Sequence, residues 1–463
     1  MDFIIVLLAL VLLMFAAYRG LSVILFAPIC ALLAVLATSP SLVLPVFSGV
    51  FMHKMVGFIE LYFPVFMLGA VFGKVIELSG FSKSIVSAVI KVVGNERAML
   101  SIVLVCALLT YGGVSLFVVV FAVYPFAAEM FKQSNIPKRL IPGTIALGAF
   151  TFTMDALPGT PQIQNIIPTT FFKTTGWAAP WLGVVGAIFI FVVGMAYLSW
   201  RRKQAVAAGE GYGTELVNEP EPFGDEKLPN PWIALTPLVI VGVMNKVFTG
   251  LIPQFYGKTH LTELPGLSKP ITTQVSSVVA VYSIKRALVL GILSVIVLGW
   301  GTIRDRFADG SKTAIAGSLL AALNTASEYG FGGVIAALPG FLLVADWLQA
   351  IPGVLLNEAV TVTALAGITG SASGGMSIAL ATMSDSFIAA ANAANIPLEV
   401  LHRVASMASG GMDTLPHNGA VITLLAVTGL THKTSYMDIF AITMIKTLAV
   451  IVVIVMYSVT GIY

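Results

Sequence analysis

Charge is scarce in this chain. Of its 463 residues, 10% are Asp, Glu, Lys or Arg and 57% are hydrophobic, whereas a soluble domain carries about 25% charged residues. The shortage excludes an ordinary water-soluble fold. Apolar runs such as 3–18 and 181–200 approach the roughly 20 residues that a helix needs to cross a bilayer. The composition therefore predicts an all-α polytopic membrane protein.

Cysteine is almost absent too, and several other features are missing. Cys30 and Cys106 both lie in apolar stretches, which is typical of small core residues and not of a disulfide or a metal pair. The sequence has no cluster with metal-ligand spacing, no nucleophile–base pair and no basic patch interleaved with aromatic residues. We therefore expect no metal, no cofactor, no enzyme activity and no nucleic-acid partner.

Four short motifs occur twice, in the same order and about 260 residues apart. The pairs are FGKVIELSGF (72–81) with FGGVIAALPGF (331–341), GGVS (112–115) with GGMS (374–377), NIP (135–137) with NIP (395–397), and MDALP (154–158) with MDTLP (412–416). This ordered series indicates two homologous halves, which we place at 1–200 and 232–463. The stretch 201–231 between them is charged and rich in Gly and Pro, so it is predicted to be a linker outside the membrane.

Basic residues predict the topology, because Lys and Arg gather in cytoplasmic loops. When the linker and most other basic clusters are placed in the cytoplasm, the first half starts outside and crosses an odd number of times. The second half then starts on the opposite side, so the two repeats are inverted and both chain ends lie outside. Lys285 and Arg286 disagree with this scheme, since they fall outside.

Each half is expected to contain ordinary spans, one re-entrant hairpin and one broken span, for about 10 to 12 spans in all. The ordinary spans are predicted at 2–18, 21–38, 57–80, 178–200, 232–249, 284–301, 313–337 and 436–461. The hairpins are predicted at 98–131, turning at Gly112 and Gly113, and at 353–392, turning at Gly374 and Gly375. The broken spans are predicted at 140–175 and 398–430.

Two polar runs, MDALPGTPQIQN (154–165) and MDTLPHNGA (412–420), interrupt apolar stretches. Irregular backbone at membrane depth is tolerated only where it is buried in protein or lines a wet cavity, and duplicated breaks are typical of secondary transporters. Half-helix N-termini at such breaks suit an anionic substrate. The groups that could bind it are Thr160, Gln162, Asn165, His417 and Asn418. The competing interpretation is that both runs are ordinary interfacial loops.

Carboxylates at membrane depth are costly, so they are candidates for a functional role. They are Asp155, Asp413, Glu328 and Asp385. Any of them could carry a coupling proton, because a carboxyl group is neutral in a dry site and ionised in a wet one. For Asp155 and Asp413 the alternative is to cap the following half-helix, and the two roles are compatible. Glu358 is expected at a solvated interface instead.

Several motifs resemble the gluconate permease (GntP) family of the ion transporter superfamily. They are FGKVIELSGF, SNIPKRLIPGTIALGAF with the following LPGTPQ, GSASGG and LPHNGAVITLL. The resemblance extends over nearly the whole chain. It implies a scaffold part and a mobile part that holds two hairpins and two broken helices. It also implies a homodimer in the inner membrane that imports a small organic acid together with protons.

The same resemblance implies a substrate site at both hairpin tips and both breaks. The tips contribute Gly112, Gly113, Ser115, Ser371, Ser373 and Gly374, and the breaks contribute Thr160, Gln162, Asn165, His417 and Asn418. Sugar-acid members have an HPGPT-like run at the first break and an Asn-Asp-Pro pattern at the second, where this chain has PGTPQ and HNGA. The departures favour a short hydroxy-monocarboxylate, as in a 3-hydroxybutyrate-type permease, over gluconate.

Two functions stay open at this point. The first is proton symport of a small organic acid, which the Ser-, Thr-, Asn- and Gly-rich breaks favour. The second is Na⁺/H⁺ or other cation/proton antiport on a related inverted-repeat fold, with Asp155, Asp413 and Asp385 as direct cation ligands. A membrane enzyme is disfavoured because no catalytic constellation is present, and a channel would not need the duplicated break.

Overall fold

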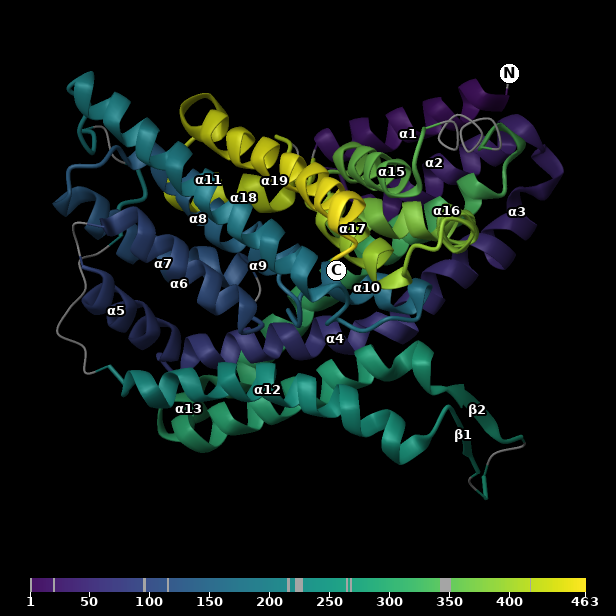
Figure 1. Cartoon of the computed structure of the whole chain (residues 1–463), viewed down its shortest axis with the longest axis horizontal. Coiled ribbons are helices and arrows are strands. Elements are labelled where there is room, and N and C mark those ends of the chain that lie inside the picture. The colour runs from purple at the N-terminus through teal and green to yellow at the C-terminus, as the bar shows by residue number, and fades with distance from the viewer. Residues whose placement is uncertain are drawn as a thin grey trace.

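Helices make up almost the whole structure, because a bilayer offers no partner for free backbone N–H and C=O groups. The computed structural model describes residues 2–19, 21–94, 97–114, 116–214, 217–220, 228–263, 265–266, 269–341, 351–416 and 418–463. Within these residues the one sheet is a pair of short antiparallel strands at an edge of the molecule (Figure 1).

The helices of the first half are α1 (Asp2–Tyr18), α2 (Val23–Thr38), α3 (Val43–Val46), α4 (Met52–Leu78), α5 (Phe81–Val93), α6 (Ala98–Tyr111), α7 (Leu116–Gln133), α8 (Ile141–Ala149), α9 (Phe152–Asp155), α10 (Ile163–Phe172) and α11 (Pro180–Ala207). The second half contains α12 (Pro231–Tyr256), β1 (Thr259–Thr262), β2 (Ile271–Gln274), α13 (Val275–Ala336), α15 (Val354–Thr369), α16 (Ala372–Ala393), α17 (Leu398–Ser409), α18 (Gly419–Thr428) and α19 (His432–Thr460).

Five helical stretches of the described chain are long and apolar enough to cross a membrane. They are Pro40–Leu78, Pro180–Ala207, Pro231–Tyr256, Val275–Ala336 and His432–Thr460. Other apolar helices, such as α1, α2, α6, α15 and α18, are shorter. Several candidate spans are therefore present, as the composition predicted, while other predicted crossings fall on helices of less than full span length.

Helix ends occur close to both predicted hairpin turns. In the first half α6 ends at Tyr111, and Gly113 follows with a φ of +99°, a conformation that only glycine adopts easily. In the second half α15 ends at Thr369, and α16 starts after Gly370 and Ser371. The prediction of a turn at Gly374 and Gly375 is wrong, since both glycines lie inside α16.

The glycines of α16 serve close packing instead of the turn. A Cβ on Gly375 would lie 2.1 Å from the backbone nitrogen of Ala366 on α15. The Ser371 side chain caps α16 by accepting a hydrogen bond from the backbone N–H of Gly374. The small residues therefore let the two arms of the hairpin touch along their backbones.

Both predicted broken spans contain a gap between helices. In the first half α8 ends at Ala149, α9 forms a single turn that ends at Asp155, and α10 starts at Ile163. In the second half α17 ends at Ser409 and α18 starts at Gly419. The interruptions begin just before the polar runs and cover most of them.

The two separate spans predicted at 284–301 and 313–337 form one helix in the structure, α13, so the predicted loop between them is wrong. This helix is not straight. A Cβ on Gly291 would touch Phe72 of α4, and one on Gly310 would touch Leu78, although a straight helix would separate Gly291 and Gly310 by about 28 Å. A Cβ on Gly299 would lie 3.1 Å from the side chain of Ser79, which follows α4, and one on Gly330 would lie 3.0 Å from the carbonyl of Phe51, which precedes it. The two parts of α13 therefore run along α4 in opposite directions, with a bend between 299 and 310.

We expect Gly375→Ala to destabilise the protein. The added methyl group would overlap the backbone of α15, and overpacking of this kind costs roughly 1–3 kcal/mol. Thermal unfolding of the purified full chain in detergent measures the loss. Gly242→Ala on α12 is the control, because nothing lies within 4 Å of a Cβ there. Equal stability of the two variants would show that the close approach of α15 and α16 is not real.

Candidate functional site

A cavity of about 890 Å³ lies where the two hairpin tips and the two breaks meet. Its lining includes Gly113 from the first tip, Gln162 from the first break, Ser371 from the second tip and Asn418 from the second break. These four segments are far apart in the sequence. The fold therefore brings the duplicated polar features of both halves to one place.

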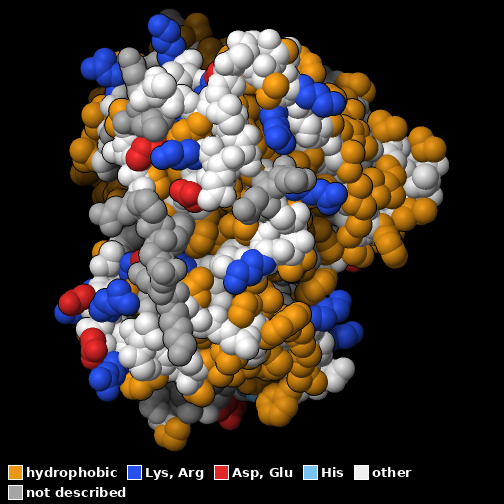
Figure 2. All heavy atoms as spheres, turned by 90° about the vertical axis from the view of Figure 1, so that its left-hand side faces the viewer, with side chains coloured by type: hydrophobic (Ala, Val, Ile, Leu, Met, Phe, Trp, Pro, Cys, Tyr) orange, Lys and Arg blue, Asp and Glu red, His pale blue; other side chains and the backbone are white. Residues whose placement is uncertain are grey.

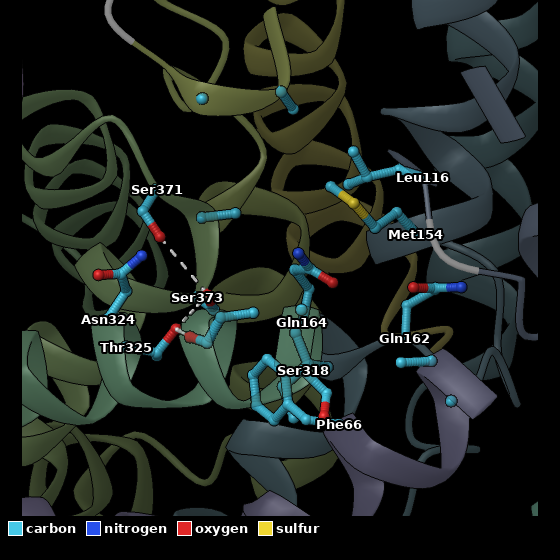
Figure 3. Close-up of a pocket in the computed structure, with 18 of the residues that line it drawn as sticks. Phe66, Leu116, Met154, Gln162, Gln164, Ser318, Asn324, Thr325, Ser371 and Ser373 are labelled. Carbon is cyan, nitrogen blue, oxygen red and sulfur yellow. Dashed lines mark hydrogen bonds between the residues drawn. The ribbon is translucent and has the colours of Figure 1, made fainter. Parts of the chain in front are cut away.

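The helices α4 and α13 form another wall of this cavity. Phe66 on α4 and Asn324 and Thr325 on α13 line it (Figure 3). The Thr325 hydroxyl lies 3.3 Å from the hydroxyl of Ser373, which in turn lies 3.5 Å from that of Ser371. A chain of hydroxyl groups thus joins α13 to the second hairpin tip.

Amide side chains from the two breaks bind the carbonyl groups at the two hairpin tips. Gln162 donates from Nε2 to the carbonyl of Thr110 at 2.8 Å. Asn418 donates from Nδ2 to the carbonyl of Gly370 at 2.7 Å, and its side-chain oxygen caps α18. Each break therefore satisfies a carbonyl at the end of a hairpin arm from its own half.

Three helices begin at the cavity. Ile163 of α10, Ala372 of α16 and Gly419 of α18 are their first residues, and all three line it. The first N–H groups of a helix have no partner within the helix, and this end carries partial positive charge. Three positive helix ends therefore face the cavity, whose lining also includes the carboxyl groups of Asp413 and Glu328.

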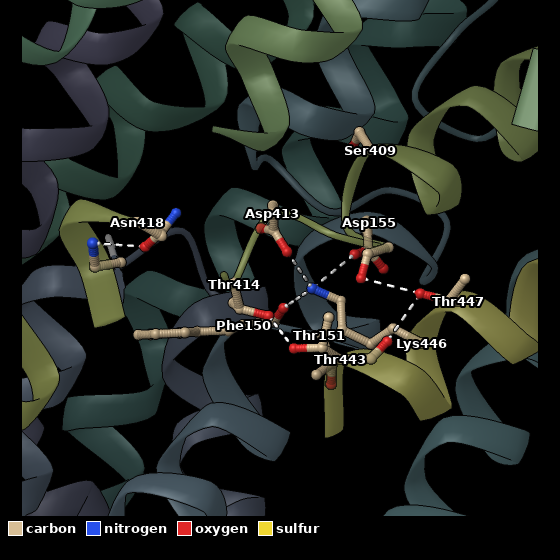
Figure 4. A network of polar contacts seen from close by, with 12 residues as sticks. Phe150, Thr151, Asp155, Ser409, Asp413, Thr414, Asn418, Thr443, Lys446 and Thr447 are labelled. Carbon is tan, nitrogen blue, oxygen red and sulfur yellow. Dashed lines mark hydrogen bonds and ion pairs between the residues drawn. The ribbon is translucent and has the colours of Figure 1, made fainter. Parts of the chain in front are cut away.

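A buried lysine connects the two breaks beside the cavity (Figure 4). Lys446 Nζ donates to the carbonyl of Phe150 at 2.6 Å and to Asp413 Oδ1 at 3.0 Å, and it lies 3.9 Å from Asp155 Oδ2. Asp155 and Asp413 occupy equivalent positions in the two repeated motifs. One ammonium group is thus shared by the equivalent carboxylates of both halves.

A second buried cation holds the first break to α17. Arg403 donates from Nη1 to the carbonyl of Asp155 at 3.2 Å and to Asn165 Oδ1 at 3.1 Å, and from Nη2 to the carbonyl of Ala178 at 2.8 Å. His402 lies 3.2 Å from the same Asn165 oxygen. These contacts fasten the backbone of the break from outside the cavity.

Glu328 is the buried carboxylate of the cavity wall that no cation in the described chain pairs with. Its Oε2 atom has no hydrogen-bond partner there. A Cβ on Gly374 would lie 1.7 Å from this oxygen, so the carboxyl group rests directly on the backbone of α16. The carboxyl group is therefore buried next to the second hairpin tip, where it shares a hydrogen bond with the side chain of Ser371 and has no cationic partner among the described residues.

Some of the remaining predicted site residues line the cavity, and others lie outside it. Asp413 lines the cavity together with Glu328, whereas Asp155 is buried behind it. Thr160 donates to the carbonyl of Thr153 at 2.7 Å within the first break. Gly112 packs on the side chain of Leu238, outside the cavity lining.

Asn165 does not line the cavity. Its Nδ2 donates to the carbonyls of Thr160 and Gly176, both at 2.9 Å, while its oxygen accepts from Arg403. All of its hydrogen-bonding capacity is thus used inside the protein, which is why it supports the break and does not face the cavity.

Asp385 lies exposed on α16, away from the cavity lining. Glu358 is fully buried on α15, so the expectation of a solvated interface is wrong for it. Ser115 and His417 lie outside the described residues.

Lys446 and Arg403 are the residues that the sequence interpretation missed. Lys446 stands alone in the apolar run of the last span, and a lone ionisable residue at that depth is itself a signal of function. Arg403 follows Glu399 and His402 in a polar stretch, where it is indistinguishable by sequence from an interfacial residue.

The helical fold and the cavity between paired hairpins and breaks define a membrane transporter. The fold is similar to that of the YdaH transporter of Alcanivorax borkumensis, with a TM-score of 0.53 and 15% identity over 88% of each chain. It is also similar to MtrF of Neisseria gonorrhoeae, described with a class of antimetabolite efflux pumps. That match has a TM-score of 0.53 and 13% identity over 87% of this chain and 82% of MtrF.

The chain belongs to the family of the uncharacterized transporter YxjC of Bacillus subtilis. The two are 60% identical over 470 residues, which covers 100% of both chains. No protein-family model matches the sequence. The chain is therefore a multi-pass membrane transporter with bacterial relatives.

These findings overturn the resemblance to the gluconate permease (GntP) family and to a 3-hydroxybutyrate-type permease. The sequence relation is to YxjC, and the fold is that of YdaH and MtrF. The motifs that carried the resemblance are glycine-rich tips and proline-broken spans. A transporter with hairpins and broken helices needs such residues for backbone reasons, so they do not identify one family.

We expect Asn165→Ala to lower the free energy of unfolding. The change leaves two buried carbonyl groups and Arg403 short of a partner, and each unsatisfied buried group costs about 1–3 kcal/mol. Asn324→Ala removes the same amide from the cavity wall and should leave the stability unchanged. Thermal unfolding of both purified variants tests this. Equal losses would contradict the supporting role of Asn165.

Proposed function

We propose that this transporter imports a small organic acid, as its anion, together with a proton. The observation that carries the proposal is that α10, α16 and α18 all begin at one cavity. Helix N-termini bind carboxylates through free N–H groups and the helix dipole. The lining combines amide and hydroxyl groups, such as those of Gln162, Asn324 and Thr325, with apolar side chains, and this mixture suits a small acid with a short apolar part, such as a short hydroxy-monocarboxylate.

The cavity keeps its anion-binding character because the opposite helix ends are satisfied elsewhere. Carbonyl groups at helix C-termini would repel an anion. Those at the two tips accept hydrogen bonds from Gln162 and Asn418, and the one at the end of α8 accepts from Lys446. At the helix starts, Ser371 takes the N–H group of Gly374, and Asn418 takes those of Ala420 and Val421. The positive ends of the three helices and the N–H groups of their first residues, Ile163, Ala372 and Gly419, are the backbone features that a ligand would meet.

Glu328 is our candidate for the coupling proton. Asp155 and Asp413 share the ammonium group of Lys446, and a nearby positive charge opposes the uptake of a proton by a carboxylate. Glu328 has no such partner among the described residues and borders the cavity. Burial disfavours a carboxylate and hydration favours it, so this group would take up a proton when the cavity closes and release it when the cavity opens.

Surface charge supports the orientation in which the two halves are inverted repeats and 201–231 is cytoplasmic. Lys and Arg side chains are spread over the face that holds the ends of α5, α7 and α11 (Figure 2). On that side Arg139 pairs with Glu210 at 2.6 Å and lowers the pKa of this carboxyl, and Arg201 pairs with Asp438 at 2.6 Å. A proton-driven importer of this orientation belongs in the bacterial inner membrane.

The alternative of cation/proton antiport loses support from the position of Lys446. Asp155 and Asp413, two of the proposed cation ligands, already bind its ammonium group, and Asp385 lies apart from them. We therefore do not place a transported metal ion between these carboxylates.

The orientation predicts which reagents reach single cysteines. In a background with Cys30→Ala and Cys106→Ala, Ala208→Cys in the linker should be protected from an impermeant thiol reagent added to intact cells. Thr460→Cys at the end of α19 should react, because the positive-inside rule places it outside. Both residues are exposed. Reaction at position 208 from outside would reverse the proposed topology.

Uptake into proteoliposomes tests the coupling. Labelled lactate, 3-hydroxybutyrate and succinate are supplied with an inward proton gradient, with Na⁺ varied separately. We expect at least one acid to accumulate in proportion to the proton gradient. Glu328→Gln should lose accumulation by at least about 10-fold, equivalent to 1.4 kcal/mol, while it still exchanges internal for external acid, because exchange does not require a net proton.

Asp385→Asn is the matched control and should accumulate normally, since that carboxylate is exposed. If Glu328→Gln accumulates as well as the unmodified protein, Glu328 is not the coupling group. If accumulation requires Na⁺ and ignores the proton gradient, proton symport itself is wrong.

A further inference from the structure

Lys446 is 2% exposed in the middle of α19, at a depth where a charged side chain is tolerated only with partners. Its surroundings consist of oxygen atoms. They are the carbonyl of Phe150, Asp413 Oδ1 and Asp155 Oδ2, at 2.6, 3.0 and 3.9 Å from Nζ. Carboxylate and carbonyl oxygens are the ligands of hard metal cations. The ammonium group thus stands among ligands that suit a metal ion.

Backbone carbonyl groups near the ends of two helices also surround this site, as in known cation sites. Phe150 follows α8, and Gly411 follows α17, so both carbonyl groups belong to helix C-termini, which carry partial negative charge. The Gly411 carbonyl accepts from the hydroxyl of Thr447, next to Lys446. In transporters with broken helices, C-terminal ends of half-helices are where coupling ions bind. In this protein the ammonium group of Lys446 occupies the place of such an ion.

We propose that the ammonium group of Lys446 is a built-in monovalent cation, which fills a latent alkali-metal site formed by Asp155, Asp413 and the Phe150 carbonyl. The protein then needs no Na⁺, and removal of the lysine nitrogen creates a Na⁺ site. The inference goes beyond the proposed function, because the site exists whatever the cargo is.

The site is tightly enclosed on the side of α17. A Cβ on Gly410 would lie 2.0 Å from Asp155 Oδ2 and 2.9 Å from the Cε atom of Lys446. A side chain there would enter the site. The Asp155 Oδ2 atom has no hydrogen-bond partner in the described chain, and it faces the ammonium group of Lys446 at 3.9 Å.

The other cation nearby does not take this place. Arg403 approaches Asp155 at its backbone carbonyl and uses its remaining donors on Ala178 and Asn165. His402 contacts Thr174 and Asn165. Of these groups Lys446 alone forms an ion pair with either carboxylate, so its removal leaves two carboxylates to be compensated.

The test uses Lys446→Met in the purified full chain. The methionine side chain ends one atom short of the lysine, so it preserves the packing of the stem and vacates the position of Nζ. The melting temperature is measured in choline chloride and in increasing NaCl, LiCl or KCl at constant ionic strength. A ligand that binds the folded state raises it in a saturable way.

We expect the unmodified protein to show no shift specific to a metal ion. Lys446→Met should melt below it in choline chloride and regain stability as NaCl rises, with saturation. The double variant Lys446→Met/Asp413→Asn should lose this response, because it lacks the closer carboxylate. If Lys446→Met does not fold, Lys446→Met/Asp155→Asn replaces it, since it removes one charge of each sign, and it should show a weaker Na⁺ response.

The proposal is overturned if Lys446→Met folds and its melting temperature ignores Na⁺, Li⁺ and K⁺, or if Lys446→Met/Asp155→Asn, where it has to replace that variant, ignores all three ions. It is also overturned by a Na⁺-specific stabilisation of the unmodified protein that the loss of Lys446 leaves unchanged, because the metal site would then lie elsewhere. Neither result depends on which acid is transported.

Discussion

The contacts of Lys446 with the two repeated aspartates join the two helix breaks of this structure. Each half of the chain contains a helix break at membrane depth, and irregular backbone is stable there only with internal partners. The Lys446 ammonium reaches Asp413 in one break, Asp155 at the other, and the carbonyl of Phe150 where α8 ends. Because one group serves both halves, neither break can move freely without the other.

Lys446 and its surroundings lie near C-terminal helix ends, whereas the cavity is bordered by N-terminal helix ends. The carbonyl groups at the end of α8 and after α17 lie around the lysine or its neighbour Thr447, whereas the N-terminal ends of α10, α16 and α18 line the cavity. A positive charge therefore meets the negative helix ends, and the positive helix ends are left for an anion. Gln162 and Asn418 complete the separation, since they bind the tip carbonyls that would otherwise border the ligand.

The helix breaks and the approximate positions of the hairpins could be predicted from the sequence, because duplicated glycines, prolines and polar runs stand out in a hydrophobic chain. The interruptions near Asp155 and Asp413 follow from such residues. The turn of the second hairpin was misplaced, since Gly374 and Gly375 serve packing against α15 while Ser371 caps the helix. Lys446 could be noticed, but its partners depend on how α19 packs, which no local pattern encodes. The family assignment failed for a related reason: glycines and prolines that the backbone requires at hairpin tips and helix breaks recur in different transporter families.

The account depends most on the claim that a carboxylate enters this cavity with a proton. A pH-sensitive dye trapped inside proteoliposomes measures this directly, with equal pH on both sides, no Na⁺ and an external carboxylate added as a pulse. Protein-free liposomes correct for acid that crosses the lipid unaided. The account predicts that the lumen acidifies faster with the protein than without it, in step with entry of the labelled acid. Protein-dependent entry of the acid without any acidification would contradict it.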